Sequence, residues 1–303
     1  MDFTDFIGNV DAVEKLHLVA SDAIDTGGKL PHLGFFGPTG CGKTSMARII
    51  STHVDRPFVY ISSTAIKDPT FLRNLLGKYK GGAIVLLDEC HRLPETIQDN
   101  MLSILEEPAT LTSVYKGRLV YTKLPPGLSF ILATTHEGNI RDALLSRLIK
   151  IEFHEYDIEE RATIAANSLS REHGLGLDEG VVKSIGARSR SPREVLQHCN
   201  LIAMKIRQMR WQSVTQDVVE EVFRITGVDQ NGLTIRDKQV LEYLTCFEFL
   251  GLKSIASYIN MPEEDVMEKI EPWLLRNKLI IRLPRGRKIT PLGLRALEGE
   301  FIL

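Results

Sequence analysis

The chain has 303 residues, of which 43% are hydrophobic and 25% charged, and its formal net charge is −2. These values are typical of a globular chain with room for two or three domains. No apolar run approaches the roughly 20 residues that cross a bilayer, and the N-terminus lacks a signal-peptide pattern. We therefore expect a cytoplasmic protein without a membrane segment, in which any nucleic-acid binding needs a local basic patch.

Residues 1 to 150 alternate between short apolar runs and helical patterns. The runs at 33–36, 58–61, 83–87 and 128–133 are predicted strands, and a helix is predicted to begin near Thr44. Such alternation favours a parallel sheet covered by helices, an α/β fold. We take residues 1–150 as the first domain.

A glycine-rich segment follows the first predicted strand with the spacing Gly-x-x-x-x-Gly-Lys-Thr. It consists of Gly37, Pro38, Thr39, Gly40, Cys41, Gly42, Lys43 and Thr44. Glycines let the backbone turn tightly so that N–H groups point at phosphates, and the next helix adds its positive dipole end. Lys43 is expected to reach the β- and γ-phosphates, and the Thr44 hydroxyl to bind magnesium. The segment predicts a site for ATP with Mg²⁺.

Two carboxylates stand where the third predicted strand ends. Asp88 is expected to hold magnesium, and Glu89 to orient and deprotonate the attacking water. The alternative is an exposed acidic pair opening a helix, which the phosphate loop upstream disfavours. His91 either couples this site to a neighbour or is an ordinary surface residue. Cys41 and Cys90 either make the site sensitive to oxidation or are inert, and the four widely spaced cysteines predict neither a zinc site nor disulfides.

Helical patterns replace the alternation after residue 150. Asp157 and Glu160 form a predicted capping box, and residues 151–226 show no strand-like pattern, so we expect a helical lid. A polar stretch with an Asn-Gly turn then opens a third domain over 227–303. Helices are predicted over 234–249, 253–260 and 263–276, followed by two short strands joined by an Arg-Gly-Arg turn. This is the order of a winged helix.

The last predicted strands are basic. Seven cations and no acid occur between Arg276 and Arg295, and four of them are candidate DNA contacts: Arg282, Arg285, Arg287 and Lys288. A basic hairpin with a glycine at its tip can approach phosphates closely, so we expect contact with the backbone of duplex DNA. The alternative is a solvated basic strand pair. No aromatic platform for stacking single-stranded bases is evident.

Nearly the whole chain resembles the RuvB family of bacterial Holliday-junction branch-migration motors, which are AAA+ ATPases. The resemblance is carried by 37–44 (Walker A), 88–93 (Walker B), 133–135 (sensor 1), 188–193 (sensor 2) and 284–287 (the wing). It implies an AAA+ P-loop domain with a helical lid and a winged helix. It also implies a ring, expected to be a hexamer, that moves duplex DNA at four-way junctions during recombination and repair.

The resemblance also assigns single residues. Phe6 and Ile7 are expected to wrap the adenine, Thr135 to act as sensor 1, and Arg193 as sensor 2. Arg147 is expected to be an arginine finger that serves a neighbouring subunit, or else to pair with a carboxylate at a helix end. The resembled family has a second arginine two residues before this one, and this chain has Leu145 at that position.

A β-hairpin is predicted over 111–124 around Lys116-Gly117. In the resembled family a hairpin at this place docks the junction-recognising partner RuvA. In this chain the hairpin can bind a RuvA-like protein, DNA or a different partner, and the sequence does not decide among the three.

Three functions fit these features. The leading one is a ring-forming ATPase that drives branch migration. The second is an ATPase akin to clamp loaders, which loads or remodels a DNA-bound partner, although loaders usually end in a helical collar. The third is a DNA-binding switch that uses ATP only to assemble, against which the presence of Glu89 argues.

Overall fold

The computed structural model describes residues 2–115 and 118–300, which divide into two compact units between Tyr156 and Asp157. The predicted hairpin tip, Lys116-Gly117, lies outside the described residues. No helix among those described is long and apolar enough to cross a bilayer. Each unit is described by itself.

The first unit is built on a five-stranded parallel sheet with the order β2-β3-β6-β1-β7. The strands are β1 (Leu33–Phe36), β2 (Phe58–Ser62), β3 (Ala83–Asp88), β6 (Leu128–Thr134) and β7 (Ile149–Glu152). The first four confirm the predicted strands. The fifth, β7, was not predicted because a charged residue follows each of its two isoleucines. It joins the sheet beside β1, and the first compact unit runs to Tyr156.

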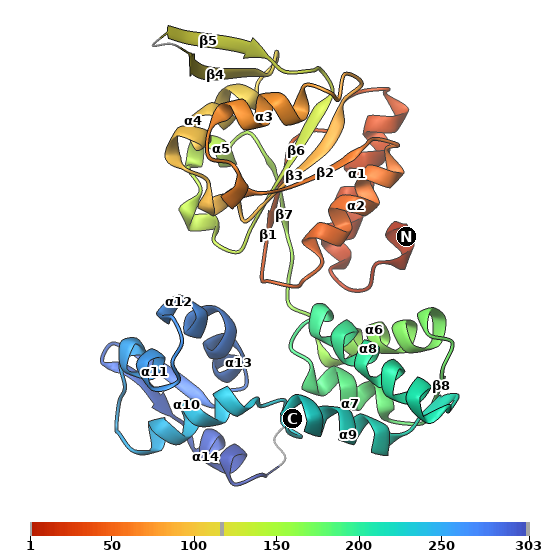
Figure 1. Ribbon diagram of the computed structural model, residues 1–303, viewed down its shortest axis with the longest axis vertical. Helices are drawn as coiled ribbons and strands as arrows, with labels where there is room; N and C mark the ends of the chain where they lie inside the picture. Colours follow the sequence, from red (N-terminus) through yellow and green to blue (C-terminus); the bar gives the residue numbers. More distant parts are fainter. Residues whose placement is uncertain (1, 116–117, 301–303) are drawn as a thin grey trace. The chain divides into compact units, whose positions relative to one another are not determined.

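Helices cover both faces of this sheet (Figure 1). On one side lie α1 (Val10–Asp25) and α2 (Lys43–His53), and on the other α3 (Pro69–Leu76), α4 (Glu95–Ile104) and α5 (Asp142–Leu145). Short 3₁₀ turns complete the unit at η1 (Phe3–Asp5), η2 (Ser63–Ala65), η3 (Cys90–Arg92) and η4 (Glu137–Asn139). Alternate residues of each strand face opposite layers, which is why the strands read as continuous apolar runs.

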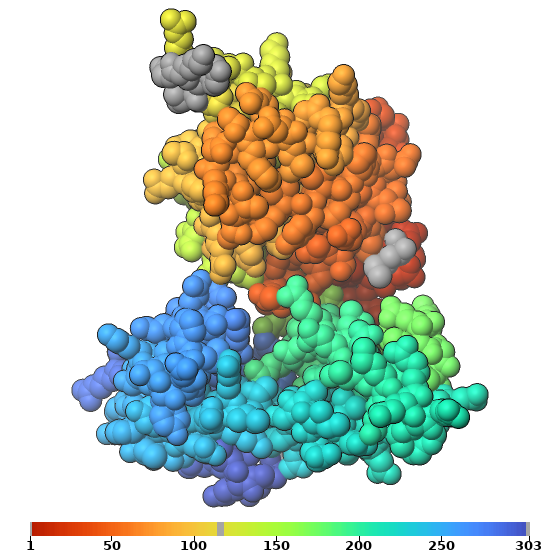
Figure 2. Space-filling view, in the orientation of Figure 1, coloured from red at the N-terminus to blue at the C-terminus, as the bar shows by residue number. Residues whose placement is uncertain are grey.

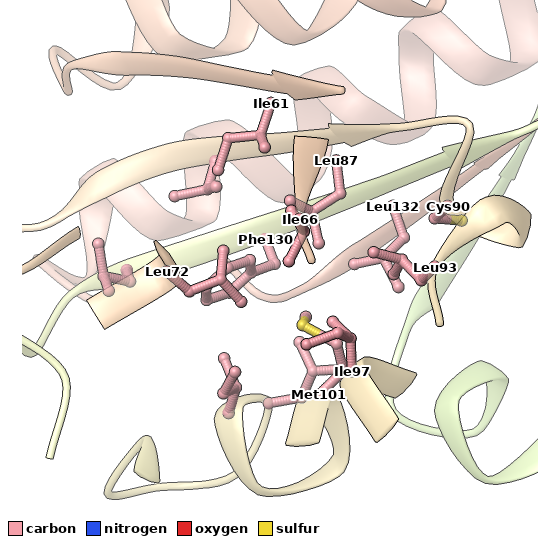
Figure 3. Close-up of a cluster of buried hydrophobic side chains, with 14 of the residues drawn as sticks. Ile61, Ile66, Leu72, Leu87, Cys90, Leu93, Ile97, Met101, Phe130 and Leu132 are labelled. Carbon is pink, nitrogen blue, oxygen red and sulfur yellow. The ribbon is translucent and has the colours of Figure 1, made fainter. Parts of the chain in front are cut away.

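A large part of the core lies between the sheet and α3 and α4 (Figure 3). Leu87 and Phe130 of the sheet pack there with Leu72 of α3 and Met101 of α4. Cys90, directly after the acidic pair, is buried in the same cluster. This packing fixes the end of β3, where the two carboxylates begin.

The predicted hairpin is confirmed. Its strands β4 (Thr110–Tyr115) and β5 (Arg118–Lys123) pair antiparallel from Thr110 opposite Lys123 to Tyr115 opposite Arg118. The hairpin projects from the body of the first unit (Figure 1).

The second unit begins with the helical lid. Its elements are α6 (Ile158–Asn167), the π-helical turn η5 (Ser168–Glu172), α7 (Val181–Arg188), α8 (Pro192–Met209) and α9 (Gln216–Thr226). The capping box is confirmed: Asp157 Oδ1 accepts from Glu160 N, and Glu160 Oε2 from Asp157 N. The lid also contains a strand pair that its sequence pattern does not indicate: β8 (Gly176–Leu177) and β9 (Ser213–Val214) pair in parallel. Two residues are too few to show an alternating pattern.

The winged helix follows in the predicted order. Its elements are α10 (Ile235–Thr245), α11 (Leu252–Tyr258), α12 (Glu263–Asp265), η6 (Val266–Ile270), α13 (Glu271–Arg276), β10 (Ile280–Leu283), β11 (Gly286–Ile289) and α14 (Pro291–Leu297). The helix predicted over 263–276 passes through the π-helical turn η6. Pro272 has no N–H to continue the i to i−4 ladder, which explains the change of winding. The lid and the winged helix have separate hydrophobic cores and lie in contact within this unit (Figure 2).

Candidate functional site

The phosphate loop needs glycine at two positions for steric reasons. Gly37 has a φ of +146°, and a Cβ there would lie 2.3 Å from the carbonyl oxygen of Phe153. Gly42 has a φ of +96°, and a Cβ there would lie 2.6 Å from the Phe6 ring. A side chain at either position would therefore strain the backbone and collide with Phe153 or Phe6. Glycine at these two positions lets the loop turn tightly beside them.

Lys43 opens α2 directly after the loop. Its Nζ donates hydrogen bonds to the carbonyl oxygens of Gly37 at 2.7 Å and Pro38 at 2.8 Å, so the ammonium lies over the loop. The first-turn N–H groups of α2 and this ammonium together form an anion site. Thr44 is the second residue of the helix. Burial raises the pKa of the Cys41 thiol, whose Sγ lies 3.9 Å from Lys43 Nζ.

The acidic pair stands at the end of β3. The Tyr60 hydroxyl donates to Asp88 Oδ2 at 3.0 Å, and the backbone N–H of Glu89 donates to Asp88 Oδ1 at 3.1 Å. Glu89 has a φ of +53°, a left-handed conformation that costs energy for a side-chain-bearing residue. This conformation turns the chain sharply and separates the directions of the two carboxylates.

A buried histidine connects this pair to the neighbouring strand. His91 Nδ1 lies 3.3 Å from Glu89 Oε2 and 2.9 Å from the hydroxyl of Thr134, the last residue of β6. Gly37 N in turn donates to the Thr134 carbonyl oxygen at 3.3 Å. The His91 side chain is only 8% exposed, so the surface interpretation of His91 was wrong. These contacts join the ends of β1, β3 and β6.

Sequence reasoning missed Tyr60 as part of this site, and it included Thr134 only within the sensor 1 segment 133–135. The signal for Tyr60 was its position near the carboxyl end of a predicted strand. The predicted sensor, Thr135, is half-buried and its hydroxyl pairs with His136 Nδ1 at 2.8 Å. Its sensing role stays a prediction.

The predicted adenine segment lies beside the loop. Phe6 approaches Gly42, and the Asn9 side chain holds the backbone of His154 with hydrogen bonds at its N–H and its carbonyl oxygen. Ile7 is half-buried in the same segment. The contact of Phe6 and Ile7 with adenine stays a prediction.

Arg147 pairs within its own chain. Its Nη2 lies 2.6 Å from Glu106 Oε1, and its Nη1 donates to the Ala143 carbonyl oxygen at 2.6 Å. The carboxylate pairing weighed as the alternative is therefore present in the single chain. The side chain is 33% exposed, and the arginine-finger role stays a prediction.

Arg193 lies exposed in the first turn of α8. Ser191 is the N-cap and Pro192 the first helical residue. Among the described residues Arg193 has no hydrogen bond or ion pair, whereas the nearby Arg188 and Arg190 are both paired. A cation at a helix N-terminus is disfavoured unless an anion approaches it. Arg193 is thus suited to meet a phosphate.

The wing cations divide into two kinds. Arg282 and Arg287 both pair with the carboxylate of Glu271, which is 1% exposed. The Arg287 side chain is only 13% exposed. Arg285 is exposed at the tip, and Lys288 Nζ lies 5.6 Å from the centre of the Phe249 ring. The sequence pattern suggested four equivalent cations, and the fold commits two of them to a buried acid. All four DNA contacts stay predictions.

The donors near the loop suit magnesium. Thr44 and Asp88 supply a hydroxyl and a carboxylate, the oxygen ligands that Mg²⁺ takes together with water and phosphate oxygens. No group of three or more His, Cys, Asp or Glu residues able to hold a metal exists among the described residues. A site with few protein ligands is the kind found where the substrate completes the coordination.

This fold and loop define a P-loop ATPase joined to a winged-helix domain. The family model "Holliday junction DNA helicase RuvB P-loop domain" matches residues 1–153, and "RuvB C-terminal winged helix domain" matches residues 230–298. The chain therefore belongs to the RuvB family. The resemblance to the RuvB family and the predicted fold class, an α/β P-loop domain with a C-terminal winged helix, are confirmed.

Relatives match over almost the full length. The chain is 27% identical to the Holliday junction branch migration complex subunit RuvB of Fervidobacterium nodosum, covering 98% of this chain and 88% of that protein. It is 29% identical to the same subunit of Limosilactobacillus reuteri, with 98% and 90% covered. The solved Thermotoga maritima RuvB Holliday junction branch migration motor is 23% identical, with a TM-score of 0.85 over 98% of this chain and 97% of that chain.

Proposed function

We propose that this protein is an ATP-driven duplex-DNA translocase that moves Holliday junctions during recombination and repair. One observation carries the proposal. A P-loop site and a winged helix occur in the same order and over the same length as in relatives named as branch-migration subunits. The match covers 88% and 90% of two of those relatives.

The residues of the first unit have separate tasks in hydrolysis. The loop N–H groups and Lys43 hold the phosphates, and Thr44 and Asp88 would hold Mg²⁺. Mg²⁺ held there would neutralise charge on the phosphates. Glu89 accepts the proton of the attacking water. His91 Nδ1 lies 3.3 Å from the Glu89 carboxylate and hydrogen-bonds the Thr134 hydroxyl at the end of β6. The positive φ of Glu89 sets the carboxylate apart from Asp88.

A ring completes the site in this proposal. Arg147 leaves Glu106 and reaches the phosphates bound by the adjacent subunit, where a guanidinium stabilises charge on the transferring phosphoryl group. The exchange of one carboxylate for a polyphosphate is electrostatically favourable. We take the ring as a hexamer and Arg193 as the sensor of bound nucleotide.

The hairpin supports a partner as well as DNA. Leu119 and Tyr121 of β5 are 62% and 68% exposed and lie two residues apart, so they share one face of the strand. An exposed apolar pair on a projecting hairpin suits a protein partner better than DNA. We propose a RuvA-like junction-recognition protein as that partner, and the bacterial cytoplasm as the location.

The other two functions receive less support. The clamp-loader alternative expects a helical collar at the C-terminus, where this chain has a winged helix. The ATP-dependent switch has no use for a positioned Glu89.

Duplex-stimulated ATP hydrolysis tests the proposal. We expect Mg²⁺-dependent hydrolysis by the full chain that rises on addition of duplex or four-way DNA. The matched control is Glu89→Gln, in which we expect ATP binding to remain and turnover to fall steeply. Hydrolysis that no DNA substrate stimulates, with or without a RuvA-like protein, would contradict the translocase.

A further inference from the structure

The Arg190 side chain joins the lid to the winged helix. It leaves the segment before α8 and pairs with Asp237 of α10, which is 0% exposed. Its guanidinium also donates to the carbonyl oxygens of Gly232 at 3.1 Å and Lys269 at 3.2 Å. The guanidinium carbon lies 5.2 Å from the centre of the Trp273 ring. One side chain thus contacts three separate segments of the winged helix.

The backbone of Arg190 is fixed to the helix that carries Arg193. Arg190 N donates to Glu194 Oε2 at 2.8 Å, and Glu194 N donates to the Ser191 hydroxyl at 3.3 Å. Ser189 Oγ lies 2.8 Å from Nδ1 of the buried His198. The first turn of α8 and the Arg190 guanidinium therefore form one rigid group.

The far end of these contacts reaches the wing. Trp273 lies on α13, two residues after Glu271, and Glu271 pairs with Arg282 of β10 and Arg287 of β11. The path from the start of α8 to the wing thus runs through charge pairs, hydrogen bonds and one aromatic contact. All of it lies within the second unit.

We infer that Arg190 is a positioning residue that transmits the nucleotide state from Arg193 to the DNA-binding wing. The inference rests on the proposed function. A shift of the first turn of α8 moves the winged helix only if the contacts between the two do not slide past each other. A guanidinium that is only 13% exposed, held by a carboxylate and two carbonyls, supplies that resistance because its bonds reach different segments of the winged helix.

The test compares junction affinity in two nucleotide states. Full-length wild type and Arg190→Met are titrated with a labelled four-way junction in the presence of ADP or a non-hydrolysable ATP analogue. We expect the wild-type affinities to differ by about tenfold between the two nucleotides, in the range usual for coupled sites. For Arg190→Met we expect that ratio to fall close to one, with ATP hydrolysis in the absence of DNA within about twofold of wild type.

Arg188 offers a matched control. It lies two residues earlier and pairs with Glu220 of α9, inside the lid. Arg188→Met should keep the wild-type ratio, Asp237→Asn should reproduce Arg190→Met, and Arg190→Lys should restore part of the ratio because the charge pair survives.

Three results overturn the inference. If the ratio of junction affinities in the two nucleotide states is the same for Arg190→Met as for wild type, the inference is overturned and the proposed function is unaffected. Equal loss in Arg188→Met and Arg190→Met, together with lower melting temperatures, reduces Arg190 to a structural role. A wild-type ratio of one with no DNA-stimulated hydrolysis overturns the proposed function as well.

Discussion

Glu89 has a left-handed backbone conformation and a carboxylate 3.3 Å from His91 Nδ1, and we propose it as the general base of hydrolysis. Glu89→Gln keeps the shape and removes the base. We expect turnover to fall by a factor of about 10² to 10⁴, the usual contribution of a general base. ATP affinity should stay within a few-fold, because Lys43 and the loop are unchanged. Steady-state hydrolysis and binding of a fluorescent ATP analogue measure the two effects, and unchanged turnover would remove Glu89 from the mechanism.

Two buried histidines make stability depend on pH. Burial lowers the pKa of His32 and of His198 to about 4, from 6.5. Above pH 6.5 both are neutral whether the chain is folded or unfolded. As the pH falls toward 4, the unfolded chain binds protons that the folded chain refuses, so stability is lost.

At pH 5 each histidine should cost about 2 kcal/mol of unfolding free energy relative to pH 7.5. His32 Nδ1 accepts from Phe130 N at 2.9 Å, so His32→Asn can retain an acceptor while losing the titrating group. Urea unfolding at the two pH values should show a smaller pH difference for this variant than for wild type. An identical pH difference would contradict the assignment.

At the scale of elements, the cations of the wing have two roles that look alike in the sequence: one pairs with a buried carboxylate, and another is exposed at the hairpin tip. Arg287→Ala removes one of two partners of the buried Glu271 carboxylate and should destabilise the second unit by about 2–3 kcal/mol. Arg285→Ala, at the exposed tip, should change stability by about 0.5 kcal/mol or less. Thermal unfolding of the two variants compares them directly.

Arg285→Ala, which should change stability little, should have a measurable effect on the affinity for duplex DNA. If Arg285 contacts a phosphate, its removal weakens binding to all sequences alike and lowers the salt slope of log K by about one. A slope equal to that of wild type would exclude Arg285 from the interface.

The elements show what the sequence could predict. The strands at 33–36 and 83–87 were predictable because both faces of the sheet are covered, which leaves an unbroken apolar run. The strands β7, β8 and β9 are short or carry exposed charges, so only their pairing defines them.

The candidate site also contains residues that the sequence predicts and contacts that only the fold defines. The loop and Asp88-Glu89 were predictable because their chemistry is local in sequence. The bond from His91 to Thr134 and the two pairs on Glu271 join residues that only the fold brings together.

The whole molecule is proposed to work as a ring in which each ATP site is shared. Glu89→Gln and Arg147→Ala should each be inactive alone, since an arginine finger contributes a factor of about 10³ to 10⁵. Mixed in equal amounts, they should regain activity at about one interface in four, where an intact Glu89 meets an intact Arg147 from the adjacent subunit. Hydrolysis by the mixture, compared with each variant alone, measures this. A mixture as inactive as its components would place Arg147 outside the neighbouring site.

Movement of a synthetic four-way junction tests the central claim most directly. The full chain, with a RuvA-like protein where required, is given Mg²⁺, ATP and a labelled junction whose arms can separate only by branch migration. The account predicts separation into duplex products with ATP, and none with a non-hydrolysable analogue or with Glu89→Gln. ATP hydrolysis at a normal rate with the junction left in place, under every partner and salt condition, would contradict it.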